Sequence, residues 1–279
     1  MPRKPRLILG TLLTASLAGT YLSWVGSTEP VAGPVTSWVA TVSLGTLLTA
    51  GVLWHRYARR AALRPDWITR RWTRLRYAAA GAAIAGLGVR VVATDALVNA
   101  SVSSASELAV GLVVLGGLAA LVRRAGHVRP PRGFAVLGSG VAVAGLVGLA
   151  WLNVGTTGGS LEGTAVRAVH LVSVGAWIGG AVWHNTVGVP AHAAASDTGV
   201  TPVLRGFQRM VPVLVVATLA TGLHQAVTWL GTNPSTYLTT TVGRLVALKL
   251  AAVLVLAVVV ARALLKRASA AGSTSENPS

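Results

Sequence analysis

Two histidines stand in an apolar stretch of this sequence, where an imidazole has few roles other than hydrogen bonding or binding a metal. They are His170 and His184, fourteen residues apart in AVHLVSVGAWIGGAVWHN, residues 168–185. In an α-helix this spacing advances about 40° short of four full turns and about 21 Å along the axis. The spacing therefore predicts both imidazoles on one helix face, one at each end of a membrane span. Neutral imidazole binds copper, zinc, nickel and iron, including the iron of haem.

Two further histidines are predicted to approach this helix from neighbouring ones. His224 is expected in a returning helix at a depth comparable to that of His170, and His55 closes an earlier apolar run at the level of His184. An ionisable residue inside a span is costly and is by default a candidate for function. His170, His224, His184 and His55 are therefore predicted metal ligands. Structural hydrogen bonding is the alternative, and for His55 and His184 so is an interfacial position.

Three other residues in the spans invite a second interpretation. Trp177 lies midway between His170 and His184, where it is either packing volume or an aromatic gate between them. Lys249 lies about two turns into the last apolar run, with Arg244 near its start. Both basic side chains either extend to the membrane interface or supply positive charge to an anionic cofactor or a buried carboxylate.

The composition shows which elements must position these residues. With 53% hydrophobic and 11% charged residues in 279, the chain is expected to be a polytopic membrane protein. A spanning helix needs about 20 mainly apolar residues. We predict an all-α bundle of about eight transmembrane helices over residues 1–267 and a disordered tail at 268–279, with spans near 7–25, 35–55, 77–94, 105–122, 134–153, 164–187, 210–230 and 242–264.

The distribution of charge predicts the topology of the bundle. Lys and Arg gather in alternate connections, at 3–6, 56–76, 123–132, 205–209 and 262–267. Short loops rich in these residues stay on the cytoplasmic side, so both termini are predicted there, with the first span retained rather than cleaved. The net charge of +17 is thereby explained without nucleic acid. Segment 56–76 is predicted to be a loop, or else a basic helix on the lipid surface.

Several absences and one glycine pair narrow the function further. The chain has no cysteine, and its two methionines are Met1 and Met210, so soft sulfur ligands are nearly missing. It also has no phosphate-binding loop and no nucleophile elbow in a plausible setting, so an enzyme or an ATP-driven pump is not expected. The pair Gly175 and Gly179 has the small-xxx-small spacing that lets two helices pack closely.

Three short motifs in the second half resemble one known family. They are HLVSVGAWIGG at His170–Gly180, TGLHQA at Thr221–Ala226 and VGRLVALKL at Val242–Leu250. In order and character they resemble the membrane domain of the CopD copper-resistance family, over roughly residues 164–265. The resemblance implies a multi-pass plasma-membrane protein that moves copper beside a CopC-like extracytoplasmic copper-binding protein, which here would be a separate chain. It also implies functional positions at His170, Trp177, Arg244 and Lys249.

Three functions remain open on these grounds. In the first, copper is captured at His170 and His224 and passes Trp177 towards His184. In the second, the chain is a b-type cytochrome in which His170 with His224, and His184 with His55, bind haem. In the third, it is a membrane assembly factor whose histidines only form hydrogen bonds. Surrounding membrane lipid is an expected partner in all three.

Overall fold

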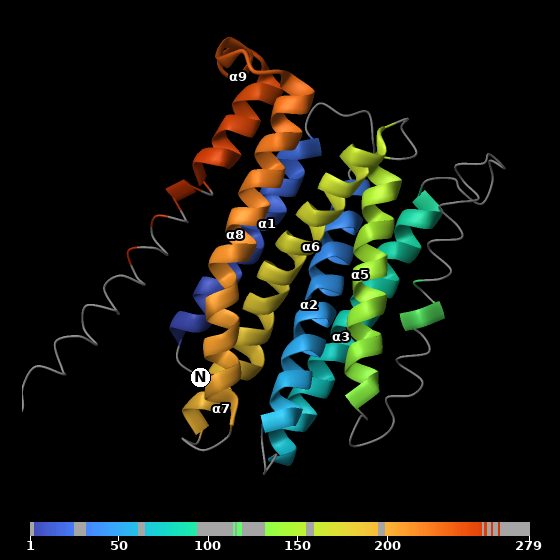
Figure 1. Ribbon diagram of the computed structural model, residues 1–279, viewed down its shortest axis with the longest axis vertical. Coiled ribbons are helices and arrows are strands. Elements are labelled where there is room, and N and C mark those ends of the chain that lie inside the picture. The colour runs from blue at the N-terminus through green and yellow to red at the C-terminus, as the bar shows by residue number, and fades with distance from the viewer. Residues whose placement is uncertain are drawn as a thin grey trace, which may run out of the picture. The chain divides into compact units, whose positions relative to one another are not determined.

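Every regular element in the described part of the chain is helical, as the all-α prediction required (Figure 1). The computed structural model describes residues 3–24, 32–60, 65–93, 114, 116–118, 132–154, 159–194, 199–252, 254, 255, 258 and 262. The helices are α1 (Arg3–Trp24), α2 (Ala32–Arg60), α3 (Asp66–Ala93), α5 (Arg132–Val154), α6 (Leu161–Trp183), the π-helix η2 (His184–Gly188), α7 (Val189–Ala194), α8 (Val200–Leu230) and α9 (Pro234–Thr239). Residues 241–252 are helical as well.

Four segments of the described chain are long and apolar enough to cross a membrane. They are Gly33–Ala58, Val136–Val154, Leu161–Ala194 and Val200–Leu230, and each contains or closely matches a predicted span. α1 and α3 cover the predicted spans at 7–25 and 77–94. Most of the predicted span at 105–122, the second half of the one at 242–264 and the predicted disordered tail lie outside the described residues.

The chain forms two compact units, residues 1–225 and 226–279. In the first unit α2 packs against α3, α5 and α6, and α5 packs against α6. Between these helices lies a core of leucine, valine and alanine side chains that includes Leu44, Ala83 and Leu146, all three with no exposed surface. The small alanines of α3 let this helix approach α2 closely.

The approach of α2 and α6 is closer still, because glycines face each other across it. A Cβ atom on Gly45 would overlap the carbonyl of Gly175, and a Cβ atom on Gly179 would overlap the backbone of Gly45 and Thr46. One turn further along α2, Thr49 donates a hydrogen bond of 3.0 Å to the carbonyl oxygen of Ala176. The predicted packing role of Gly175 and Gly179 is therefore confirmed, with α2 as the partner.

The prediction of a loop for segment 56–76 was wrong, and contact of a basic helix there with the lipid surface stays a prediction. α2 runs on to Arg60 and α3 begins at Asp66, so most of the segment is helical. Trp72 does not touch lipid: it is 1% exposed, stacks on Tyr57 at 5.5 Å and donates to the carbonyl oxygen of Ala50. The reason is amphipathic spacing, because Ile68 and Trp72 share a buried face one turn apart while Arg70, Arg71 and Arg74 remain exposed.

α6 does not continue as a regular helix to residue 187. It ends at Trp183, and His184 begins the π-helix, in which the amide of Val189 donates to the carbonyl of His184. Pro190 has no amide hydrogen to bond the carbonyl four residues earlier, and the wider i to i+5 bonding accommodates this. π-helices of this kind are frequent at functional sites, and this one fixes the position of His184.

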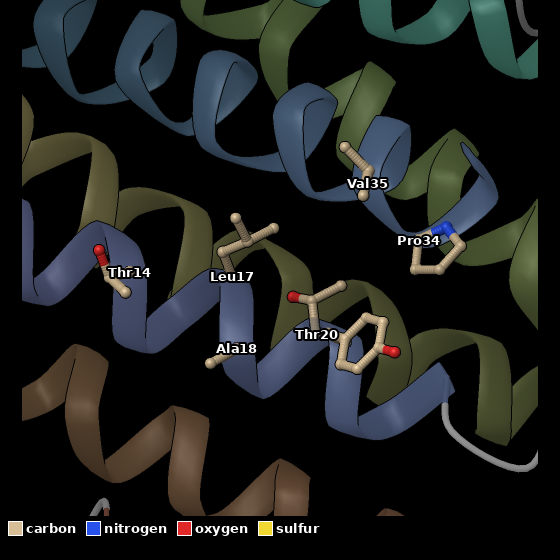
Figure 2. Close-up of a pocket in the computed structure, with 7 residues that line it drawn as sticks. Thr14, Leu17, Ala18, Thr20, Pro34 and Val35 are labelled. Carbon is tan, nitrogen blue, oxygen red and sulfur yellow. The ribbon is translucent and has the colours of Figure 1, made fainter. Parts of the chain in front are cut away.

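An apolar pocket of about 310 Å³ lies between α1 and the start of α2 (Figure 2). No charged or imidazole side chain lines it; its walls come from Thr14, Leu17, Ala18, Thr20, Tyr21, Pro34 and Val35. This lining offers an ion no anionic or imidazole ligand.

Substituting Gly179 with alanine is expected to destabilise the first unit. Overpacking usually costs about 1–3 kcal/mol, which outweighs the gain in helix propensity of up to about 1 kcal/mol. Gly140→Ala is the matched control, because a Cβ atom there would meet nothing within 4 Å. Thermal unfolding of the purified protein in detergent should show a lower Tm for Gly179→Ala and an unchanged or higher Tm for Gly140→Ala. Equal Tm values would contradict the close α2–α6 contact.

Candidate functional site

The two histidines of α6 both face α8. Nδ1 of His170 lies 3.0 Å from Oγ1 of Thr221, and the ring of His184 lies 6.4 Å from that of Phe207, centroid to centroid. Fourteen residues separate the two partners on α8, as they separate the two histidines on α6. The helices are therefore antiparallel and in register over about four turns. We call this contact the α6–α8 seam.

The residues between the two histidines form a stripe that is neither core nor surface. His170, Val174, Trp177, Ala181 and His184 are all half-buried. The opposite face of α6 is buried throughout its middle, at Leu171, Ser173, Gly175, Ala176, Ile178, Gly179, Gly180 and Trp183. His170 and His184 thus share one face, as predicted. This face is the half-buried stripe, and Trp177 lies at its centre.

The surroundings of His170 fix the tautomer of its imidazole. The hydroxyl of Thr221 lies 2.6 Å from the carbonyl oxygen of Ala217, a separation at which the hydroxyl proton must lie between the two oxygens. Oγ1 of Thr221 is then the acceptor for His170, and Nδ1 of His170 is the donor. The lone pair of the neutral ring is therefore on Nε2, the nitrogen through which such a histidine binds metals. The ring also lies against the backbone of Gly222.

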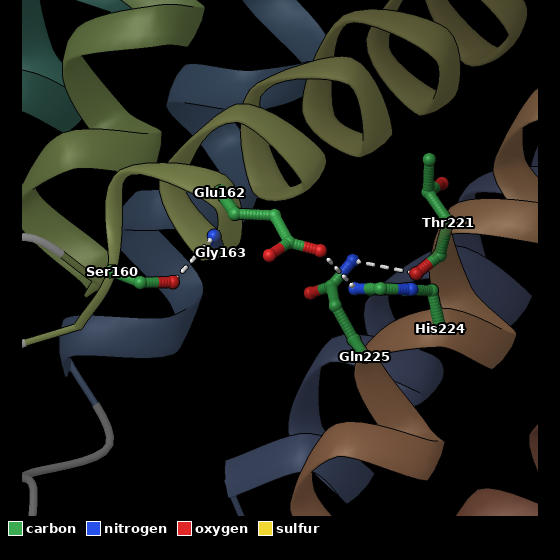
Figure 3. Close-up of polar contacts among 6 residues, drawn as sticks. All are labelled: Ser160, Glu162, Gly163, Thr221, His224 and Gln225. Carbon is green, nitrogen blue, oxygen red and sulfur yellow. Dashed lines mark hydrogen bonds and ion pairs between the residues drawn. The ribbon is translucent and has the colours of Figure 1, made fainter.

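Two further polar contacts join α6 to α8 beyond His170. Nη1 of Arg167 donates to Oε1 of Gln225 at 3.0 Å, and Nε2 of His224 lies 3.7 Å from Oε1 of Glu162 (Figure 3). Ser160 positions Glu162, because its side chain caps α6 by accepting from the amide of Gly163. Glu162 was not predicted as a site residue; it lies about two turns before His170 and about 80° around the helix from it.

Buried polar atoms accompany the seam and its inner end. In the described part of the chain, Oγ1 of Thr218, Nε1 of Trp183 and Nδ1 of His55 are buried and have no hydrogen-bond partner. Thr218 lies one turn from Thr221 and Gly222, the residues that contact His170. A buried polar atom left without a partner costs about 1–3 kcal/mol.

Two other predicted site residues, Arg244 and Lys249, belong to the second unit. Nε of Arg244 donates to the carbonyl oxygen of Leu238 at 2.6 Å, which secures the last turn of α9. Lys249 is half-buried in the helical segment 241–252 of the second unit. A ligand role for His55 and His184, and a cofactor role for Arg244 and Lys249, stay predictions.

Within the described ranges, no three histidine, cysteine, aspartate or glutamate side chains lie close enough together to hold a metal ion. Any site built from the described residues therefore has at most two such ligands and completes its coordination with other donors. The pairing of His170 with His224 around one ion stays a prediction.

Residues 201–278 match the family described as CopD, Copper resistance protein D. This match confirms the resemblance to the CopD family over α8, α9 and the helical segment that follows. It includes Thr221, His224 and Arg244, whereas the motif that begins at His170 precedes it. No curated protein and no solved structure matches the chain.

The tautomer of His170 can be measured directly. In the purified protein with ¹⁵N-labelled histidine, we expect His170 to be protonated at Nδ1 and unprotonated at Nε2, because Thr221 accepts from Nδ1. Thr221→Val should remove this preference, and Thr221→Ser should restore it. His192, an exposed histidine whose Nδ1 lies 3.0 Å from Oγ1 of Thr201, should be unaffected by either variant. An Nε2-protonated His170 in the unsubstituted protein would contradict the assignment.

Proposed function

We propose that this chain is a multi-pass plasma-membrane protein of the CopD type that passes copper across the membrane along the α6–α8 seam. The match of residues 201–278 to the CopD family supports the copper assignment. Four segments of membrane-spanning length support the location. The alternation of basic connections along the sequence supports eight spans with both termini in the cytoplasm.

The observation that carries the proposal is the fixed imidazole of His170. Thr221 holds its Nδ1 as a donor, so Nε2 has the lone pair that a copper ion requires. An ordered partner on the other ring nitrogen is the usual support of a metal-binding histidine, and its loss typically weakens metal binding by about 10–100-fold. His170 is therefore the proposed outer copper ligand, and Thr221 is the residue that positions it.

The half-buried stripe of α6 provides the rest of the path. About 21 Å separates His170 from His184, too far for direct transfer of an ion between them. The ion would pass Val174 and the indole face of Trp177, which attracts cations, and the hydroxyl of Thr218 would become its partner on the way. At the inner end His184 and His55 are the proposed receiving ligands.

The types of ligand atom in the chain indicate which oxidation state of copper it would bind. The chain has no thiolate, and Met210 is the one thioether beyond the initiator. Imidazole and oxygen donors suit Cu(II), and imidazole also binds Cu(I). We propose that a separate CopC-like extracytoplasmic protein supplies the ion, that no ATP is consumed, and that Arg244 and Lys249 act at the membrane interface rather than on copper.

His170→Ala is expected to lower copper flux into proteoliposomes at least tenfold while the protein still inserts. Thr221→Val should also lower the copper flux, since about 10–100-fold of metal affinity depends on the partner of a metal-binding histidine. Thr221→Ser should recover most of the flux. His192→Gln is the control for loss of a histidine elsewhere. Flux of His170→Ala equal to that of the unsubstituted protein would refute the proposed path.

A further inference from the structure

Glu162 and His224 form a carboxylate–imidazole pair at the end of the seam where α6 begins. Figure 3 shows the two side chains pointing toward one another from α6 and α8. Oε1 of Glu162 lies 3.7 Å from Nε2 of His224, longer than a hydrogen bond. The side chains are 77% and 47% exposed, respectively, so neither is enclosed by the protein.

The separation of the two atoms fits a shared metal ion. Bonds of about 2.1 Å from a metal to a carboxylate oxygen and to an imidazole nitrogen span 3.7 Å when they meet at about 125°. The 90° angle between neighbouring ligands of a tetragonal Cu(II) site would require the two atoms to be about 0.7 Å closer. Small rotations of two exposed side chains supply that difference, so no movement of α6 or α8 is needed.

The local charges near this pair are of both signs. Glu162 lies in the first turn of α6, where the helix dipole favours negatively charged groups over cations. Arg167 is the nearest cation that the contacts of the seam identify, and its Nη1 is engaged by the amide oxygen of Gln225. The pair itself thus offers one anionic oxygen and one imidazole nitrogen.

We infer that Glu162 and His224 bind Cu²⁺ and form the outer capture site that feeds the seam. One carboxylate oxygen and one imidazole nitrogen are a donor set for Cu(II) rather than for Cu(I), and water completes the coordination. Glu162 lies eight residues before His170, about 12 Å along α6, so an ion released here is delivered towards Nε2 of His170. That delivery depends on the proposed function, whereas the binding of Cu²⁺ does not.

The competing interpretation is an ordinary surface ion pair between a carboxylate and a protonated histidine. Such pairs contribute about 0–1 kcal/mol to stability, and no ligand would depend on them. The two interpretations differ in one measurable respect: only a capture site loses Cu²⁺ binding when Glu162 is replaced by its neutral isostere.

The test is a Cu²⁺ titration of the full chain in detergent, followed by electron paramagnetic resonance, in a His170→Ala background that removes the proposed inner ligand. We expect a Cu²⁺ signal with a single imidazole nitrogen, separate from any signal of copper bound by His184 and His55. Adding Glu162→Gln or His224→Gln should weaken this binding at least tenfold. Adding His192→Gln, which removes an exposed histidine elsewhere, should leave it unchanged.

The possible outcomes test the Glu162–His224 site separately from the proposed copper path. Full Cu²⁺ binding by the Glu162→Gln variant would overturn the inference even if His224→Gln lost binding, because the carboxylate would then not be a ligand. Equal loss in His192→Gln would overturn it too, since the binding would be nonspecific. If the pair binds Cu²⁺ but His170→Ala transports copper normally, the capture site stands and the proposed path fails.

Discussion

The backbone contact between α2 and α6 is the constraint on which the rest of the structure depends. Gly45 and Gly179 leave no space for a Cβ atom at this contact, and one on Gly175 would be tightly crowded. The orientation of α6 about its own axis is therefore fixed. Gly175 and Gly179 lie about 140° and 180° around the helix from His170. Burying the glycines against α2 therefore turns the histidine stripe away from the core and towards α8.

The α6–α8 contact is of the opposite kind, because side chains rather than backbones meet there. His170 with Thr221, Arg167 with Gln225 and Glu162 with His224 join the two helices. Hydrogen bonds between membrane helices are worth only about 0.6 kcal/mol each on average, so these contacts orient side chains more than they stabilise the fold. A rigid α2–α6 pair with a more weakly held α8 is a suitable arrangement for a seam through which an ion passes.

Local spacing in the sequence predicted much of this arrangement. The fourteen residues between His170 and His184 place both on one face in any regular helix, and the glycine spacing indicated a close contact, though not its partner on α2. The helical character and the approximate places of four spans followed from hydrophobic composition for the same reason, because they depend on neighbours along the chain.

The contacts that the sequence did not predict depend on which helices become neighbours. Glu162 and His224 are 62 residues apart in the sequence and lie on different helices. No local pattern predicts that these two positions face each other. Trp72 follows an arginine pair, a sequence context typical of the membrane interface. In the structure it stacks on Tyr57 and bonds the carbonyl of Ala50. Arg244 donates a hydrogen bond to the carbonyl oxygen of Leu238, in the helix before its own. This local contact was not predicted, because Arg244 was expected to act on a cofactor or at the membrane interface.

The most direct test of copper as the cargo is to measure what the purified protein contains. An absorption spectrum before and after dithionite, combined with copper and iron analysis after incubation with copper and washing, distinguishes the three functions that the histidines allow. We predict a protein without visible haem bands that retains copper, and that retains less copper when His170 is replaced. A Soret band with sharpened α-bands on reduction and stoichiometric iron would contradict it in favour of a b-type cytochrome, and a protein that holds neither metal would leave the histidines a structural role.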